Sequence, residues 1–190
     1  MTEAYLTSLK KQFEYYKILA EKTFAQVPDD RLFWQYNDDS NSMAVIVRHL
    51  SGNMLSRWTD FLITDGEKEW RNRDAEFEND VTSREELMRT WNEGWTCLFH
   101  GVTALSVEDL DKVVYIRNQG HTVIEAIDRQ LAHCAYHVGQ IVFIGKMISG
   151  NKWTSLTIPK GASKAFNNEK FSQEQHTEHF TDKIVRRNNS

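Results

Sequence analysis

Two histidines stand four residues apart in the stretch LAHCAYHVGQIVFIGK, which runs from Leu131 to Lys146. Apolar residues recur along this stretch with helical spacing, so we expect a helix that places His133 and His137 on one face, one turn apart. Two neutral imidazoles in this arrangement can reach a single metal ion. A third ligand from another helix would complete a three-ligand site with an open position, which is typical of catalytic rather than structural zinc.

A third histidine, His49, lies in the stretch NSMAVIVRHLSGN, for which a second helix is predicted. A helical projection places His49 on the flank of the apolar stripe, beside Asn53 and Ser56. This position suits a metal ligand at the mouth of a crevice, and it equally suits a solvated surface histidine. Arg57 projects close to the apolar centre of the same helix. It either binds an anionic substrate or is a structural cation that extends to solvent or pairs with an acid.

The order of these segments resembles the DinB/YfiT-like superfamily of small four-helix-bundle metalloproteins. The stretch around His49 is followed by a helix without histidine ligands and then by TVIEAIDRQLAHCAYHVGQIV, and the resemblance covers roughly Met1 to Ser149. In that superfamily one histidine of the second helix and the two of an HxxxH on the fourth bind a divalent metal. The resemblance therefore implies His49, His133 and His137 as ligands here. Members include bacillithiol and mycothiol S-transferases and a thiol-dependent maleylpyruvate isomerase, and they commonly dimerise.

Four amphipathic segments predict an all-α fold, a four-helix bundle with long connections that occupies residues 1–150. The expected helices run from Thr2 to Gln26, from a cap at Asn41 or Ser42 to Thr64, from a cap at Thr82 or Ser83 through Leu105, and from a capping box of Thr122 and Glu125 to Ser149 before Gly150. Trp70 and Phe77 are expected to anchor the connector between the second and third helices, residues 65–80. The run KVVYIR and the turn signal after it predict a short β-hairpin before the fourth helix.

Residues 151–190 differ in composition from the bundle. The stretch WTSLTIPKGASKAFN is broken by Pro159 and Gly161, which indicates an extended arm lying on the bundle. From about Glu169 onward the tail is polar and of mixed charge without a periodic apolar face, so weak order is expected. His176 and His179 lie in this tail. We leave them out of the site because nothing around them forms a rigid set of ligands.

Composition and charge narrow the classes of function. The chain has 190 residues and a formal net charge of −4, with Lys and Arg scattered among acids, so we expect no nucleic-acid partner. No apolar run is long enough to span a bilayer and the N-terminus lacks a signal-peptide pattern, so a cytoplasmic protein without membrane contact is expected. Cys97 and Cys134 are expected to be buried thiols rather than disulfide partners or nucleophiles.

Three imidazole nitrogens suit zinc, nickel, copper or iron, and zinc is the first choice on availability and by analogy with the superfamily, with nickel as an alternative. We expect an enzyme resembling thiol S-transferases, in which the metal activates a low-molecular-weight thiol and Arg57 and Asn53 contact a small-molecule substrate. A metal-dependent hydrolase and a non-catalytic dimeric metal-binding stress-response bundle remain as alternatives. The apolar face around Val142 and Phe143 is the expected homodimer interface.

Each ligating ring should donate its second N–H to an oxygen atom, as histidine ligands of metals usually do. Asn53, Asp128 or a backbone carbonyl are the expected acceptors. Gln140 is expected on the same helix face as His133, where it either lies behind the ligands or packs within the bundle, and it is not expected to be a ligand.

Overall fold

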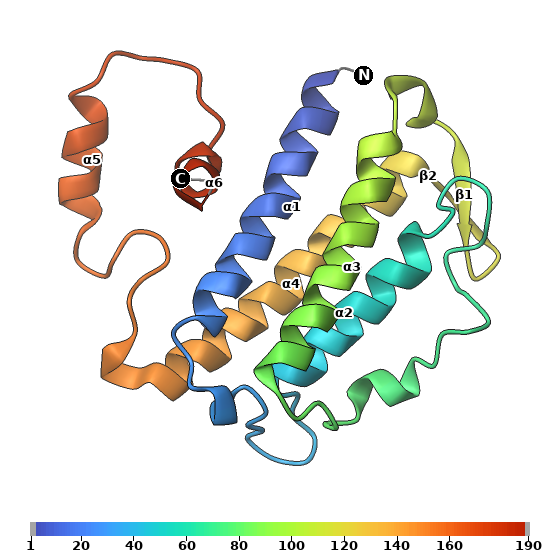
Figure 1. The fold of residues 1–190 in the computed structure, drawn as a ribbon. Coiled ribbons are helices and arrows are strands. Elements are labelled where there is room, and N and C mark those ends of the chain that lie inside the picture. Colours follow the sequence, from blue (N-terminus) through green and yellow to red (C-terminus); the bar gives the residue numbers. More distant parts are fainter. Residues whose placement is uncertain (1–2, 189–190) are drawn as a thin grey trace.

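Four long helices packed side by side form the body of the molecule, as the sequence predicts (Figure 1). The computed structural model describes residues 3–188. The helices are α1 (Glu3–Phe24), α2 (Met43–Trp58), α3 (Arg84–Ala104) and α4 (Val123–Ser149). Thr2, where the first helix is expected to begin, lies outside the described residues. None of the described helices is both long enough and apolar enough to cross a membrane.

Side-chain caps fix where three of these helices begin. The hydroxyl groups of Ser42 and Ser83 accept backbone N–H groups at the starts of α2 and α3. Thr122 and Glu125 form a reciprocal capping box at the start of α4. Gly150 ends α4 with a φ of 51°, a backbone conformation that residues with a side chain rarely adopt. All of these signals are local, and the sequence alone therefore predicts them.

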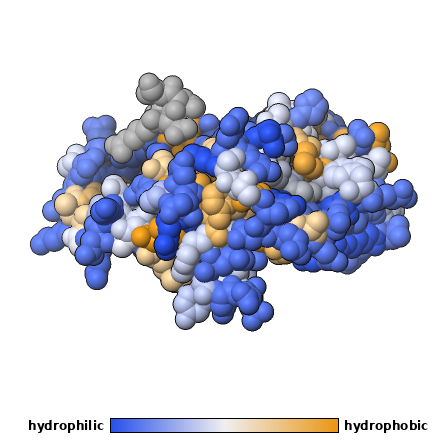
Figure 2. Space-filling view, turned by 60° about the horizontal axis from the view of Figure 1, so that its bottom comes forward, coloured by the Kyte–Doolittle hydropathy of each residue, from blue (hydrophilic) through white to orange (hydrophobic). Residues whose placement is uncertain are grey.

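The core lies between the four helices and is rich in aromatic rings. Trp91 and Trp95 of α3 are completely buried, and their rings pack edge to face with centroids 5.3 Å apart. Phe24 and Phe13 of α1 pack edge-on against these two indoles. Most of the face in Figure 2 is hydrophilic, with scattered apolar patches. The close packing of these aromatic rings in the core gives a rigid frame for side chains that project from α2 and α4.

The close approach of α2 and α3 depends on Gly94. A Cβ atom at this position would lie 2.7 Å from the Cα atom of Ser51, a backbone atom that cannot move aside. We expect Gly94→Ala to lower the free energy of unfolding by about 1–3 kcal/mol, because overpacking forces the two helices apart. Thermal melting should show a decrease of roughly 2–4 °C for each kcal/mol.

Gly139 in α4 is the matched control for this substitution, because a Cβ atom there would meet no atom within 4 Å. Alanine has the higher helix propensity, so Gly139→Ala should raise stability by about 0.5–1 kcal/mol. A Gly94→Ala protein as stable as Gly139→Ala would contradict the close packing of α2 on α3.

A short hairpin leads into α4, as predicted. β1 (Val113–Ile116) pairs antiparallel with β2 (Gln119–Thr122), and Arg117 and Asn118 form the turn with positive φ angles. The carboxylate of Asp65 accepts the backbone N–H groups of both turn residues at 2.8 Å. The connector (residues 65–80) is therefore fastened to the hairpin beside the start of α4.

The predicted end of the second helix is wrong. α2 ends at Trp58 and not at Thr64, because Thr59 is extended and Asp60 takes a φ of 50°. Aspartate tolerates this left-handed conformation better than most residues, so the chain turns away here and does not continue the helix. Single 3₁₀ turns occur at Asp29–Arg31, Asp74–Phe77, Val107–Asp109 and Gly150–Lys152.

One of the two predicted anchors of the connector is also wrong. Trp70 is 60% exposed and does not fasten the connector to the bundle. Phe77 is half-buried, as an anchor should be. Two charged side chains of this segment, those of Arg71 and Glu76, are buried instead, with 3% and 8% of their surfaces exposed. Hydrophobicity alone does not predict this arrangement, because the charges are buried as a pair.

The C-terminal segment holds two short helices where the sequence predicts an extended arm and a weakly ordered tail. The chain is irregular over residues 153–162, followed by α5 (Ser163–Phe171) and α6 (Asp182–Asn188). Figure 1 shows α6 beside α1, with α5 farther out. Lys11 of α1 pairs with Asp182 at 2.8 Å, and the ring of His179 bonds the hydroxyl of Ser8 at 2.9 Å. These contacts with α1 stabilise α6, a helix that the polar composition of the tail does not predict.

Candidate metal centre

Three histidines from two helices converge beside the bundle core. His49 projects from the middle of α2, and His133 and His137 project from the middle of α4. One nitrogen of each ring lies within 4.8 Å of the other two, and Nε2 of His49 is 3.1 Å from Nε2 of His133. Tetrahedral ligands at about 2.05 Å from an ion lie roughly 3.4 Å apart, so small ring rotations would bring all three nitrogens onto one ion. The histidines that the sequence singles out are therefore together, and they could hold a metal ion.

The rings are more enclosed than a surface position would allow. His49 is 6% exposed and His137 is 8% exposed, so the alternative of a solvated surface histidine at position 49 is wrong. The connector covers this flank of α2, and the ring of Phe77 lies 4.9 Å from the ring of His49. His49 lies off the centre of the apolar stripe because it faces the connector rather than the middle of the bundle.

Hydrogen bonds fix the outer nitrogens of two rings. Nδ1 of His49 lies 2.9 Å from Oε2 of Glu76, and Nδ1 of His137 lies 2.8 Å from Oε1 of Gln140. Because an ionised carboxylate or an amide oxygen only accepts, each ring donates an N–H from Nδ1 and is left unprotonated at Nε2. Metal sites built from histidine typically have such an oxygen behind each ligand. Gln140 lies behind the ligands, which is one of the two positions predicted for it.

Neither Asn53 nor Asp128 supports a ligand, contrary to the prediction. Asp128 accepts a hydrogen bond from the hydroxyl of Tyr5 at 2.9 Å, and Asn53 lines a neighbouring cavity. Sequence reasoning missed Glu76 because it lies in the irregular connector, 27 residues from the histidine that it supports. No helical or strand periodicity relates two positions in such different elements.

Glu76 is itself held by Arg71. Nε of the guanidinium donates to Oε1 at 2.7 Å and Nη2 donates to Oε2 at 3.0 Å, and the Arg71 side chain is 3% exposed. Burial acts to raise the pKa of Glu76, but hydrogen bonds from His49 and Arg71 outweigh it, so the pKa lies below its ordinary value. Glu76 is therefore charged at neutral pH. Gly52 of α2 makes room for it, because a Cβ atom there would collide with the carboxylate.

His133 has no such support. Its Nδ1 is buried and has no hydrogen-bond partner among the described residues. Burial, and after it the positive charge that His137, His49 and Arg57 can carry, lowers the pKa of His133 to about 3. The ring is therefore neutral at neutral pH, which is the form that binds metal ions. Three close imidazoles, two of them oriented and one with an unpaired outer nitrogen, fit a divalent ion.

A family model matches residues 1–162 of the chain, and its family is described as "Protein of unknown function (DUF1572)". The chain belongs to this family. The DUF1572 family belongs to the DinB/YfiT-like clan. This agrees with the resemblance of the segments around the three histidines to that superfamily. No curated protein matches the chain. The family match continues past the end of α4 into the irregular segment that follows it.

In this DUF1572 chain a cavity of about 270 Å³ opens beside the histidines. Its wall contains His49, His133 and Asn53, several apolar side chains, and five arginines, which are Arg57, Arg71, Arg73, Arg117 and Arg129. A divalent ion held by the three histidines would face this cavity, because two of its ligands lie in the cavity wall. Only one of the five arginines, Arg57, is among the residues that the sequence singles out.

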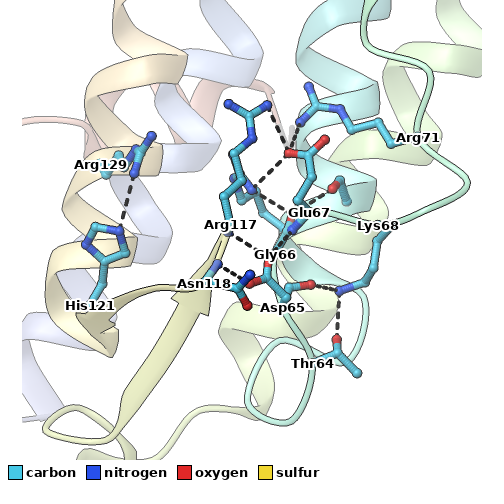
Figure 3. Close-up of polar contacts among 12 residues, drawn as sticks. Thr64, Asp65, Gly66, Glu67, Lys68, Arg71, Arg117, Asn118, His121 and Arg129 are labelled. Atoms are coloured by element: carbon cyan, nitrogen blue, oxygen red, sulfur yellow. Dashed lines mark hydrogen bonds and ion pairs between the residues drawn. The ribbon is translucent and has the colours of Figure 1, made fainter.

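Arg57 is both a structural cation and a wall residue. Its Nη1 donates to the carbonyl oxygen of Gly66 at 2.7 Å and lies 3.5 Å from Oε2 of Glu67. Figure 3 shows the guanidinium groups of Arg71 and Arg117 reaching the same Glu67 carboxylate. Burial, followed by the positive charge of Arg71, lowers the pKa of Arg57 to about 10, so it stays charged at neutral pH. Arg57 therefore forms the structural ion pair that was one of its two predicted roles. The other role, binding an anionic substrate, stays a prediction.

Neither cysteine lies in the cavity wall. Cys134 is buried, and burial raises the pKa of its thiol to about 12. Cys97 is half-buried on α3, with its sulfur 3.6 Å from the hydroxyl of Thr59. The prediction of buried thiols therefore holds for Cys134 and in part for Cys97. The chain therefore supplies no thiol of its own to the cavity beside the three histidines.

Proposed function

We propose that the protein is a metal-dependent enzyme that transfers a low-molecular-weight thiol to an electrophile. His49, His133 and His137 would hold a divalent ion, with zinc as the first choice and nickel as the alternative. The ion would deprotonate a thiol bound at its open position and would lower the pKa of a water molecule bound there. The resemblance to a superfamily that includes bacillithiol and mycothiol S-transferases supports this reaction class.

One observation carries the proposal: the cavity beside the histidines offers no nucleophile of its own. Among the described residues, its wall contains no serine, threonine, cysteine, lysine, tyrosine or carboxylate. The attacking atom must therefore come from a small molecule. Hydrolysis would also use a base to accept a proton from water. Glu76, which lies behind His49, is committed to that ring and to Arg71, so it is not available as this base. Together with the resemblance to thiol S-transferases, this favours thiol transfer.

The transfer itself requires few groups from the protein. The thiol loses its proton to solvent, its sulfur forms a bond to the electrophilic carbon, and a leaving group such as a halide departs with its bonding electrons. Arg57 and Asn53 would contact polar groups of the substrate from the cavity wall. Trp58 and Phe61 would exclude water from the reacting carbon, since both side chains lie in the same wall.

Product analysis with a panel of thiols tests the proposal. Metal-loaded protein, purified without a histidine tag, would be incubated with an electrophilic aryl halide and with glutathione, cysteine, bacillithiol or mycothiol, or with water alone. We expect mass spectrometry to detect a thioether above the uncatalysed level with at least one thiol, and we expect His133→Ala to abolish this excess. A hydrolysis product without thiol would support the hydrolase alternative. No turnover with any thiol or with water would support the non-catalytic metal-binding bundle.

Dimerisation stays a prediction, and the outer face of α4 is the surface that it would use. Phe143 is 65% exposed, Tyr136 is 64% exposed and Met147 is 49% exposed, while Val142 is half-buried. The rings of Tyr136 and His137 lie 4.9 Å apart, so a dimer formed here would lie close to the metal centre. Sedimentation analysis of the purified chain would decide between monomer and dimer.

A further inference from the structure

The wall of the cavity carries more positive than negative charge. Five guanidinium groups line it, and among the described residues the carboxylates that pair with them are Glu67 and Glu76. The excess of five over two is three positive charges, although the whole chain has a formal net charge of −4. Composition does not explain such a local excess. Like charges at close range repel one another unless a bound anion offsets them.

Three of the arginines are already used by the fold. Arg71 binds Glu76, and Arg57, Arg71 and Arg117 share the single carboxylate of Glu67. Figure 3 shows Arg71 of the connector and Arg117 of the hairpin turn reaching that carboxylate, and Nη1 of Arg57 from α2 lies 3.5 Å from its Oε2. They fix the connector in place and are themselves fixed. Two carboxylates among three guanidinium groups leave this part of the wall with one positive charge in excess.

The other two arginines have no carboxylate partner within the described part of the chain. The guanidinium of Arg73 lies over the ring of Phe77, 5.0 Å from its centroid. Arg129 of α4 uses one donor in a hydrogen bond to Nε2 of His121 at 3.4 Å, as Figure 3 shows, and keeps four more. Both side chains are exposed, and they reach the cavity from different elements. They are therefore free to bind a ligand that enters from solvent.

We propose that this cavity binds a small oxyanion with at least two negative charges, recognised by Arg73 and Arg129. A guanidinium plane matches carboxylate and phosphate oxygens with paired, charge-assisted hydrogen bonds, so a dicarboxylate and a phosphate group share the required chemistry. The inference rests on the proposed function in one respect only. The anion is taken to be part of the thiol or of the electrophile that reacts beside the histidines.

The dimensions of the cavity favour a small anion over a large one. A volume of about 270 Å³ lies just below the roughly 300–1,000 Å³ of typical ligand pockets, which suits a short dicarboxylate or a phosphate ester better than a nucleotide. The charge is gathered in one concave site and does not form a stripe along the surface, so a nucleic acid is not favoured. An uncharged electrophile that filled the cavity would displace water from Arg73 and Arg129 without giving either guanidinium an anionic partner.

Calorimetric titration of simple anions tests the inference. Succinate and inorganic phosphate would be titrated into metal-free protein, with uncharged succinamide as the control ligand, and succinate would also be titrated into zinc-loaded protein. The metal would be removed with a neutral chelator, because EDTA is itself a polyanion. We expect at least one anion to bind and succinamide not to bind. Arg129→Gln and Arg73→Gln should each weaken the binding roughly ten- to hundredfold.

Arg89→Gln is the matched control, because it removes the same charge from α3, where Arg89 pairs with Glu93 outside the cavity. Its affinity for the anion should equal that of the wild type. Binding of succinate alone would identify a dicarboxylate site, and binding of phosphate alone a phosphate site. No binding of either anion, or equal weakening in Arg89→Gln and Arg129→Gln, would overturn the inference. The assay needs neither thiol nor turnover, so anion binding and thiol transfer can fail separately.

Discussion

Replacing His137 by alanine is expected to remove metal from the protein while the bundle stays folded. Four-ligand structural zinc sites contribute about 10–16 kcal/mol, or about 3 kcal/mol for each ligand, so loss of one ligand should weaken metal binding at least about a hundredfold. The aromatic core around Trp91 and Trp95 is formed without His137, and the melting temperature of the metal-free variant should fall by only a few degrees. Elemental analysis of tag-free protein and competition with a chromophoric chelator would measure the affinity.

His100→Ala supplies the matched control, because His100 is an exposed histidine of α3 outside the cluster. Its metal content should equal that of the wild type. A His137→Ala protein that keeps one equivalent of metal at wild-type affinity would exclude the three-histidine centre. A large fall in the melting temperature of the wild type on metal removal would instead indicate an ion that stabilises the fold, as in the non-catalytic alternative.

The four helices of the bundle could be predicted because their signals are local. Ser42, Ser83 and the capping box at Thr122 each lie next to the helix that they start, and Gly150 lies next to the helix that it ends. The end of α2 carries no such mark. It is set by the backbone at Asp60, and an apolar pattern that continues to Phe61 hides it. Boundaries without a cap residue are the least predictable part of a helix.

The convergence of the histidines was predictable for a different reason. His133 and His137 share one helix face through their spacing, whereas His49 joins them only through the resemblance to a superfamily. Burial of His49 depends on the connector, and the helical projection of α2 contains no information about a segment that follows it. The support that Glu76 and Arg71 give to His49 could not be inferred for the same reason, because the tertiary position of an irregular segment places both residues.

The clustering of the arginines around the cavity could be predicted from the sequence even less. They come from α2, the connector, the hairpin turn and α4, and in sequence they look like the scattered basic residues of an acidic chain. Only the fold gathers them. The charge pattern of the sequence therefore argues correctly against a basic stripe and gives no sign of a basic cavity.

Replacing Glu76 by alanine is expected to have the largest effect of any change outside the histidines. Arg71 would keep only Glu67, at 3.4 Å, and breaking a buried ion pair by removing one partner typically costs about 3–5 kcal/mol. His49 would also lose the acceptor of its Nδ1–H, and loss of such support weakens metal affinity roughly 10–100-fold. Thermal melting of the metal-free variant should show a decrease of roughly 6 °C or more, and chelator competition should show the weaker metal binding.

Two companion variants separate the charge of Glu76 from its shape. Glu76→Gln keeps a carbonyl oxygen that can accept from His49 but removes the charge that faces Arg71, so stability should fall while metal affinity falls less than in the alanine variant. Glu78→Ala removes an exposed acid of the same connector and should change neither quantity. Equal behaviour of Glu76→Ala and Glu78→Ala would mean that Glu76 neither orients His49 nor neutralises Arg71. Because one carboxylate serves both partners, fold stability and metal affinity should decline together whenever it is lost.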